Sequence, residues 1–113
     1  MSRDWRLYIG DMIRSCDRIL QYSRGLAREE FERHEMAYDA IVRNLGLLGE
    51  AARQIPLQVR ERTVGVEWPK IIALRNILIH GYFGVDDDIL WDVVMNRVSA
   101  LRSSLSALEH SAD

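Results

Sequence analysis

Apolar residues recur at steps of three and four along most of the chain, the spacing that places side chains on one face of an α-helix. The stripe nearest the N-terminus consists of Trp5, Tyr8, Met12, Cys16 and Ile19. Ser2 is the expected N-cap of the helix that carries this stripe. The helix should end around Gly25, because glycine commonly follows the last helical turn.

A second long helix carries a heptad-like stripe, formed by Tyr38, Ile41, Leu45, Leu48, Ala52 and Ile55. Such spacing favours long, nearly antiparallel packing against a neighbouring helix. Gly46 and Gly49 lie within it, and each should cost helix stability relative to alanine. We therefore expect them to allow close approach of another helix or of a partner chain. Pro56 ends this helix, and short helices are expected at residues 27–35 and 57–63.

A third helix should hold Pro69 in its first turn and end near Gly81. A fourth long helix should begin at residues 86–88, where three aspartates can cap it and meet the positive end of its dipole. Its expected apolar face is Ile89, Leu90, Val93, Val94, Val98, Leu101, Leu105 and Leu108. The aspartates could also attract a cation, but capping explains them more simply. The sequence thus predicts a single domain over residues 1–113, an all-α, antiparallel up-and-down bundle of four main helices with short connecting helices.

Charge and composition limit the classes of function. The net charge of −2 gives no overall field for nucleic acid, so any such binding needs a local patch. No apolar run approaches the roughly 20 residues that cross a bilayer, and no export signal is visible, so we expect a cytoplasmic protein without membrane contact. Cys16 is expected in the core. Fourteen of the fifteen basic residues are arginine, which suits phosphate binding but also fits a biased genome.

Few residues remain as candidates for chemistry. The chain has no Gly-rich phosphate loop, CxxC, HExxH or GxSxG motif, and we expect no metal or cofactor. His34 and His110 fit the surface. Arg75, Asn76, His80 and Tyr82 lie together in the segment RNILIHGY.

The angular positions of these candidates matter. Asn76 and His80 fall on one face of a helix, whereas Arg75 and His80 are about 140° apart. Either the helix ends before His80, or Arg75 and His80 meet across a dimer axis.

These residue types match RNA cleavage by the 2′-hydroxyl. His80 can transfer protons near neutral pH, Arg75 can hold the phosphate, and Asn76 can orient either group. A two-fold dimer would supply a second histidine. A plainer interpretation also fits, in which Arg75 is solvated and His80 meets the negative end of the helix dipole.

The segment also matches a family motif: arginine, four residues, histidine, any residue, tyrosine. With AYDAIVRNLGLLGEAARQIP, WPKIIALRN and ILWDVVMNRV, it resembles the HepT-like ribonuclease toxins of the HEPN superfamily over nearly the whole chain. The resemblance implies a HEPN-like bundle that dimerises, with Arg75 and His80 lining a central cleft for metal-independent RNA cleavage. It also implies a minimal nucleotidyltransferase antitoxin that modifies Tyr82 with AMP groups. Gly46 departs from the larger polar residue expected there.

Two functions from different classes stay open. The first is the ribonuclease toxin. The alternative is a non-catalytic helical subunit that serves a nucleotidyltransferase as substrate or docking partner. A DNA-binding repressor is disfavoured, because the chain is acidic and has no basic recognition helix.

Overall fold

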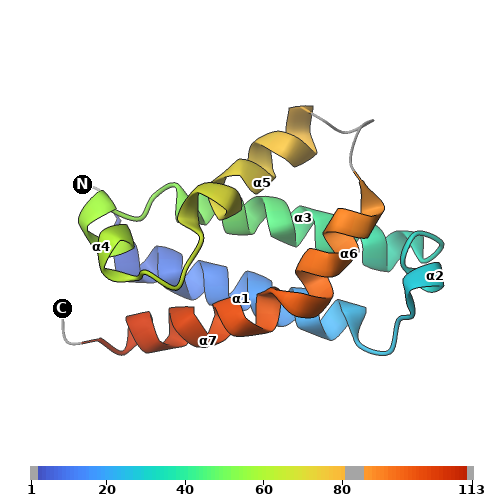
Figure 1. Ribbon diagram of the computed structural model, residues 1–113, viewed down its shortest axis with the longest axis horizontal. Coiled ribbons are helices and arrows are strands. Elements are labelled where there is room, and N and C mark those ends of the chain that lie inside the picture. The colour runs from blue at the N-terminus through green and yellow to red at the C-terminus, as the bar shows by residue number, and fades with distance from the viewer. Residues whose placement is uncertain (1–2, 81–85, 112–113) are drawn as a thin grey trace.

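The computed structural model describes residues 3–80 and 86–111, apart from the side chains of residues 77–80. Over these residues the chain is all-helical, which confirms the predicted fold class (Figure 1). The helices are α1 (Trp5–Ser23), α2 (Arg28–Phe31), α3 (Glu35–Ala52), α4 (Leu57–Arg62), α5 (Trp68–His80), α6 (Asp87–Asn96) and α7 (Val98–Glu109).

The bundle is antiparallel and centres on α1. Helices α3 and α7 both run opposite to α1 and pack along it, and α5 packs on α3 (Figure 1). The shared core contains Ile9, Met12, Cys16, Ile19, Ile41, Leu45, Leu48, Val94, Val98 and Leu105, each at most 1% exposed. The predicted core position of Cys16 is confirmed.

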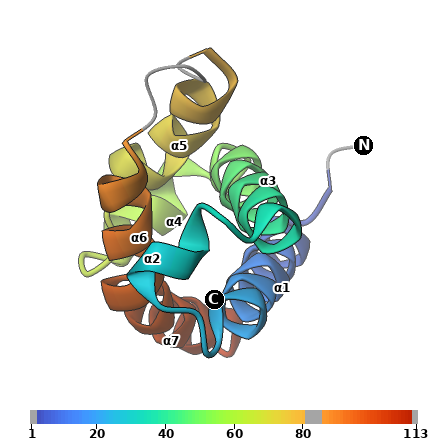
Figure 2. The same cartoon turned by 90° about the vertical axis from the view of Figure 1, so that its right-hand side faces the viewer.

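The short helix α2 closes one end of the bundle, as the end-on view shows (Figure 2). Its Phe31 is fully buried, and the Phe31 ring centre lies 5.1 Å from that of Tyr38 and 5.2 Å from that of Trp91. These rings are tilted, an arrangement that aromatic pairs favour. The short segments predicted at residues 27–35 and 57–63 are thus confirmed as helices α2 and α4.

The cap of α1 differs from the prediction. Asp4 occupies the N-cap and its side chain accepts a hydrogen bond from the backbone N–H of Arg6 at 2.9 Å. Ser2 lies outside the described residues. The other end is as expected: α1 stops at Ser23, and Gly25 has a φ of +81°, a conformation that glycine adopts without strain.

The heptad-like stripe of α3 faces the interior of its own chain. Ile41, Leu45, Leu48 and Ala52 are buried, and Ile55 is buried in the turn after the helix end. Asn44 is also buried, and its side-chain amide donates to the carbonyl oxygen of Ala40 at 2.8 Å. This stripe is therefore core and is not available as a subunit interface.

The predicted fourth helix is divided. It breaks at Arg97, whose backbone (φ −122°, ψ −31°) joins α6 to α7. Helix α7 follows α1, whereas α6 turns toward α2 and places Trp91 against Phe31 (Figure 1). Ile89 belongs to the predicted apolar face but is 62% exposed, so that part of the face is not covered within the described chain.

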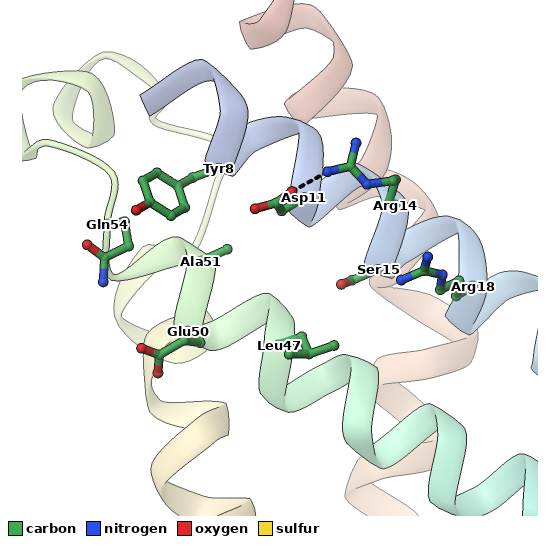
Figure 3. A pocket seen from close by; sticks show the side chains of 9 residues that line it. All are labelled: Tyr8, Asp11, Arg14, Ser15, Arg18, Leu47, Glu50, Ala51 and Gln54. Carbon is green, nitrogen blue, oxygen red and sulfur yellow. Dashed lines mark hydrogen bonds and ion pairs between the residues drawn. The ribbon is translucent and has the colours of Figure 1, made fainter. Parts of the chain in front are cut away.

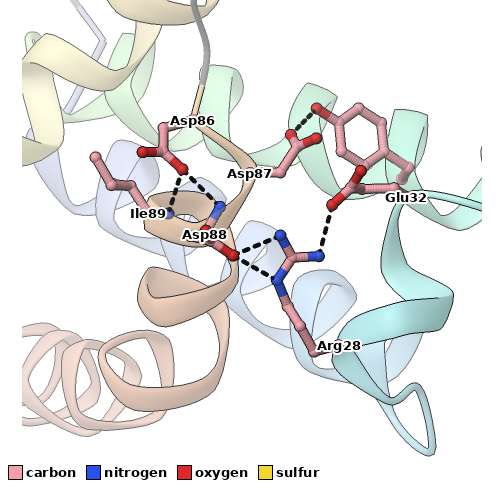
Figure 4. A network of polar contacts seen from close by, with 7 residues as sticks. Arg28, Glu32, Asp86, Asp87, Asp88 and Ile89 are labelled. Carbon is pink, nitrogen blue, oxygen red and sulfur yellow. Dashed lines mark hydrogen bonds and ion pairs between the residues drawn. The ribbon is translucent and has the colours of Figure 1, made fainter.

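The three aspartates at the start of α6 act as structural groups (Figure 4). Asp86 is the N-cap and accepts from the backbone N–H of Asp88 at 2.8 Å. Asp87 accepts from the hydroxyl of Tyr38 at 2.5 Å. Asp88 accepts from Arg28, which also contacts Glu32, so α6 is tied to α2 and α3. The capping interpretation is confirmed.

Long apolar helices are lacking in the part of the chain that the structure describes: none of its helices could cross a membrane.

Candidate active site

Helix α5 positions the candidate residues, and its first turn is firmly anchored. Trp68 is buried, and its indole N–H donates to the hydroxyl oxygen of Thr63 at 2.8 Å. Pro69 lies in the first turn, as predicted. Glu67, just before the helix, pairs with Lys70 at 2.7 Å and with Arg97 at 2.9 Å, and the Lys70 hydrogen bond is the main cause that lowers the Glu67 pKa. These contacts fix where α5 begins.

Arg75 lies in the middle of α5 and forms an ion pair with Glu50 of α3. The Arg75 Nε lies 2.5 Å from the Glu50 Oε2, and the Arg75 side chain is 35% exposed. The Glu50 Oε2 is shielded from solvent and makes no hydrogen bond within the described residues. The ion pair with Arg75 is therefore the main interaction that balances its negative charge. Since the contact uses Nε, the two terminal amino groups of Arg75 can still donate to a phosphate.

Gly49 allows this ion pair to form. A Cβ at Gly49 would lie 2.7 Å from the carbonyl oxygen of Ile71 and 3.0 Å from the backbone nitrogen of Arg75. The backbones of α3 and α5 thus approach more closely than any side chain there would permit. The close approach expected for Gly49 is confirmed, whereas a Cβ at Gly46 would have no described neighbour within 4 Å.

The other candidates lie at the far end of α5. Asn76 is exposed. His80 is the last residue of the helix, so α5 ends where the sequence predicted and the helix does not stop before the histidine. Of the two routes that could unite Arg75 and His80, an early helix end is therefore excluded. Tyr82 lies outside the described residues, so its role stays a prediction.

Sequence reasoning missed the role of Glu50, although it singled out the segment that contains this residue. Glu50 and Arg75 come from different helices, and a stripe along one helix does not reveal a polar contact with another. The available signal was Gly49, which marked the point of closest helix packing next to Glu50.

The two remaining histidines lie at helix ends, where they bond to backbone groups. His34 is the N-cap of α3, and its Nδ1 accepts from the backbone N–H of Ala37 at 3.2 Å. His110 follows α7 and its Nδ1 lies 2.8 Å from the Ser106 carbonyl oxygen. Both are exposed, as the sequence predicted. Within residues 3–80 and 86–111, the described side chains form no group of three or more His, Cys, Asp or Glu residues that could hold a metal ion.

Comparison with known proteins identifies a family. Residues 12–108 match the family model described as "Ribonuclease HepT-like". "Putative RNase MJ1380" of Methanocaldococcus jannaschii is 33% identical, covering 92% of this chain and 95% of its own length. "Putative RNase TTE0752" of Caldanaerobacter subterraneus is 29% identical over 91% of this chain and 92% of its own. "Probable ribonuclease HepT" of Thermococcus cleftensis is 29% identical, covering 96% of this chain and 98% of its own length. No solved structure gives a significant match.

Proposed function

Because this chain belongs to the ribonuclease HepT-like family, we propose that it is the toxin of a type II toxin–antitoxin pair and cuts RNA without a metal ion. The observation that carries this proposal is the family match itself, which spans 97 residues from 12 to 108 and includes the whole segment from Arg75 to Tyr82. The ion pair that holds Arg75 beside α3 adds a structural reason for a functional arginine at this position.

The proposed reaction is attack of the RNA 2′-hydroxyl on the adjacent phosphorus. The P–O bond to the 5′-oxygen breaks as the bond to the 2′-oxygen forms, which leaves a 2′,3′-cyclic phosphate and a free 5′-hydroxyl. One His80 accepts the 2′-hydroxyl proton, and a second His80 protonates the leaving oxygen. Arg75 stays charged and stabilises the negative phosphate oxygens, and Asn76 orients the phosphate or the imidazole.

Two copies of the chain are needed to assemble this site. Helix α5 remains helical from Arg75 to His80, so these positions are about 140° apart around its axis. Each chain also supplies only one His80. A homodimer with α5 near its two-fold axis would bring the second histidine and a second arginine to the same cleft.

A surface for such a dimer is present beside α5. A groove of about 520 Å³ separates α5 from α6 and α7, and its apolar lining includes Leu74, Ile89, Val93 and Leu101. The apolar stripe of α3, where a partner chain could otherwise have packed, is buried within the chain. These two observations support our proposal of a dimer seam along α5.

The proposed partner is a minimal nucleotidyltransferase antitoxin. It would transfer AMP from a nucleoside triphosphate to the Tyr82 hydroxyl, with pyrophosphate as the leaving group. Each AMP adds a negative phosphate and a bulky base two residues from His80, so it would repel and block an RNA backbone at the same site.

The test is cleavage of single-stranded RNA in the presence of a chelator by wild type, Arg75→Ala and His80→Ala. Wild type should produce fragments with cyclic phosphate ends, and both variants should be inactive. Equal activity of wild type and His80→Ala would refute the catalytic assignment. After co-expression with the antitoxin, intact mass should rise by whole AMP units, and Tyr82→Phe should remove the increment.

A further inference from the structure

A second groove lies on the other side of Glu50 from α5, between α1 and α3 (Figure 3). It has a volume of about 400 Å³, within the range of small-ligand sites. The side chains that matter to its chemistry are Tyr8, Asp11, Arg14 and Arg18 from α1, Glu50 from α3, and Gln54 from the turn after α3. Because Glu50 both lines this groove and contacts Arg75, the groove adjoins the candidate active site.

Both carboxylates of the groove are already compensated by arginines. Asp11 accepts from Arg14 and also from Arg3, whose Nη1 lies 2.6 Å from the Asp11 Oδ2. Glu50 pairs with Arg75 at 2.5 Å and has the Nη1 of Arg53 at 4.0 Å. Neither carboxylate therefore presents an uncompensated negative charge to a ligand.

The arginines outnumber these carboxylates. Arg18 lines the groove, is exposed, and has no ion-pair partner among the residues that the structure describes. Four arginines pair with the two carboxylates, namely Arg3, Arg14, Arg53 and Arg75, and Arg18 lines the same groove as a fifth. On a chain of net charge −2, this is the kind of local positive patch that anion binding requires.

An aromatic ring and an amide complete the groove. Tyr8 is half-buried, and the Arg3 guanidinium lies 4.7 Å from the centre of its ring. Figure 3 shows Tyr8 and Gln54 together at one end of the groove, with Arg14 and Arg18 along the α1 side. Aromatic rings stack on unpaired bases, amides hydrogen-bond base edges, and arginines hold the backbone, a combination typical of sites for single-stranded nucleic acid.

We propose that the groove between α1 and α3 binds single-stranded RNA and leads it to Arg75. Arg18, supported by Arg14, holds a phosphate, and Tyr8 stacks on a neighbouring base. The choice of RNA rests on the proposed ribonuclease function, whereas the binding of a single-stranded polyanion rests on the groove alone.

The first test measures binding without cleavage. The probe is a 2′-O-methylated single-stranded RNA, which has no free 2′-hydroxyl and therefore cannot be cut by the proposed reaction. Arg18→Ala should bind it about tenfold more weakly, the effect of one lost charge-assisted contact. The slope of log K against log salt should also fall by about 0.7, the value for one phosphate on a single strand.

Arg33→Ala is the matched control, because Arg33 is exposed in the turn between α2 and α3, at the opposite end of the bundle from Tyr8 and Gln54 (Figure 1). It removes the same charge and should leave affinity and salt slope unchanged. Equal losses for Arg18→Ala and Arg33→Ala would overturn the proposal, since binding would then reflect overall charge. Wild-type affinity in Arg18→Ala would overturn it as well.

A second pair of variants tests stacking. Tyr8→Phe keeps the ring and should keep the affinity, whereas Tyr8→Leu keeps an apolar side chain but should bind about tenfold more weakly. Thermal unfolding of both variants checks that the bundle is intact. Equal affinity of folded Tyr8→Leu and wild type would overturn the stacking role. A duplex probe that binds as tightly as the single strand would also contradict the assigned ligand.

The two proposals can fail separately, because the probe reports binding alone. Arg18-dependent binding by a protein that cuts no RNA would refute the ribonuclease assignment and support the groove. If the protein cuts RNA normally and Arg18→Ala binds RNA as tightly as wild type, the proposed role of the groove is refuted. Loss of antitoxin binding, but not of RNA binding, in Arg18→Ala would also refute it, since the groove would then receive an acidic protein segment.

Discussion

The guanidinium of Arg75 has to serve two partners if it is to hold an RNA phosphate, because its Nε already contacts a carboxylate oxygen of Glu50. Such a division suits the planar, five-donor shape of arginine, in which one edge can be fixed while the other binds a ligand. Glu50 would then set the direction of the free edge. Both side chains are more than one-third exposed, so solvent screening keeps their contribution to stability small.

Glu50→Gln should separate positioning from stability. The neutral amide loses the charge that holds Arg75, so RNA cleavage should fall about ten- to a hundredfold, the scale of a small misplacement of a catalytic group. The free energy of unfolding should change by less than about 1 kcal/mol. Cleavage rates and thermal unfolding measure the two effects.

Asp17→Asn is the control for this variant, since it removes a similar ion pair, between the Asp17 Oδ1 and the Arg102 Nε at 2.9 Å, that joins α1 to α7. Its cleavage rate should equal that of wild type. Undiminished cleavage by Glu50→Gln would show that Arg75 needs no carboxylate to position it.

Cys16 gives a pH-dependent prediction at the same scale. The side chain is fully buried, and burial raises the pKa of its thiol from 9.0 to about 12. The folded state therefore favours the neutral thiol, so its contribution to stability is complete below pH 9 and is lost as pH rises toward 12. Above about pH 9 the loss should reach up to about 1.4 kcal/mol per pH unit.

The measurement compares denaturant unfolding of wild type and Cys16→Ala at several pH values. Cys16→Ala should be less stable at neutral pH because it leaves a cavity, and the gap between the two proteins should narrow above about pH 9. A gap that stays constant up to pH 11 would mean that the native thiol ionises as freely as the unfolded one.

Among the elements, the contact between α3 and α5 decides where Arg75 lies. Gly49 lies against the backbone of α5 with no room for a Cβ, whereas Gly46, one turn earlier on α3, has no neighbour within 4 Å of an added Cβ among the described residues. The two glycines thus form a natural pair of probes. One tests the helix contact, and the other tests helix propensity alone.

Gly49→Ala should destabilise the protein by about 1–3 kcal/mol, because the added methyl group forces two helix backbones apart. Gly46→Ala should stabilise it by about 0.5–1 kcal/mol, since alanine is the better helix former and meets no neighbour. Chemical denaturation measures both. A Gly49→Ala protein as stable as Gly46→Ala would contradict the close helix contact.

The sequence predicts the helices more completely than their breaks and contacts. Apolar spacing was enough to locate the segments that form α1 and α3, because each buries one continuous stripe. The segment that forms α5 was located by Pro69 and Gly81. It missed the break at Arg97, since Val94, Val98 and Leu101 continue at steps of four and three through it and no proline or glycine marks it. The break follows from tertiary packing: α6 contacts α2 through Trp91 and Asp88, while α7 packs along α1.

The same limit applies to the candidate site. The motif from Arg75 to Tyr82 is visible in one short segment, but the Glu50 partner comes from a helix 25 positions earlier in the chain. A polar contact between two helices depends on their relative rotation and distance, which periodicity along each helix does not define. Gly49 was the one local clue to that distance.

For the whole molecule, we propose that the working unit contains two chains. The helix continues through His80, and positions 75 and 80 are therefore about 140° apart around its axis. One chain also carries a single histidine in the motif, whereas proton removal and leaving-group protonation require two carriers. A chain acting alone should be unable to complete the proposed reaction.

This central claim is tested most directly by mixing wild type with an excess of His80→Ala chains under conditions that exchange subunits, and measuring RNA cleavage per wild-type chain. If the site needs one His80 from each chain, mixed dimers are inactive, and cleavage per wild-type chain should fall in proportion to the wild-type fraction. If wild-type chains keep their full activity while mixed dimers form, each chain works alone and the two-chain site is refuted.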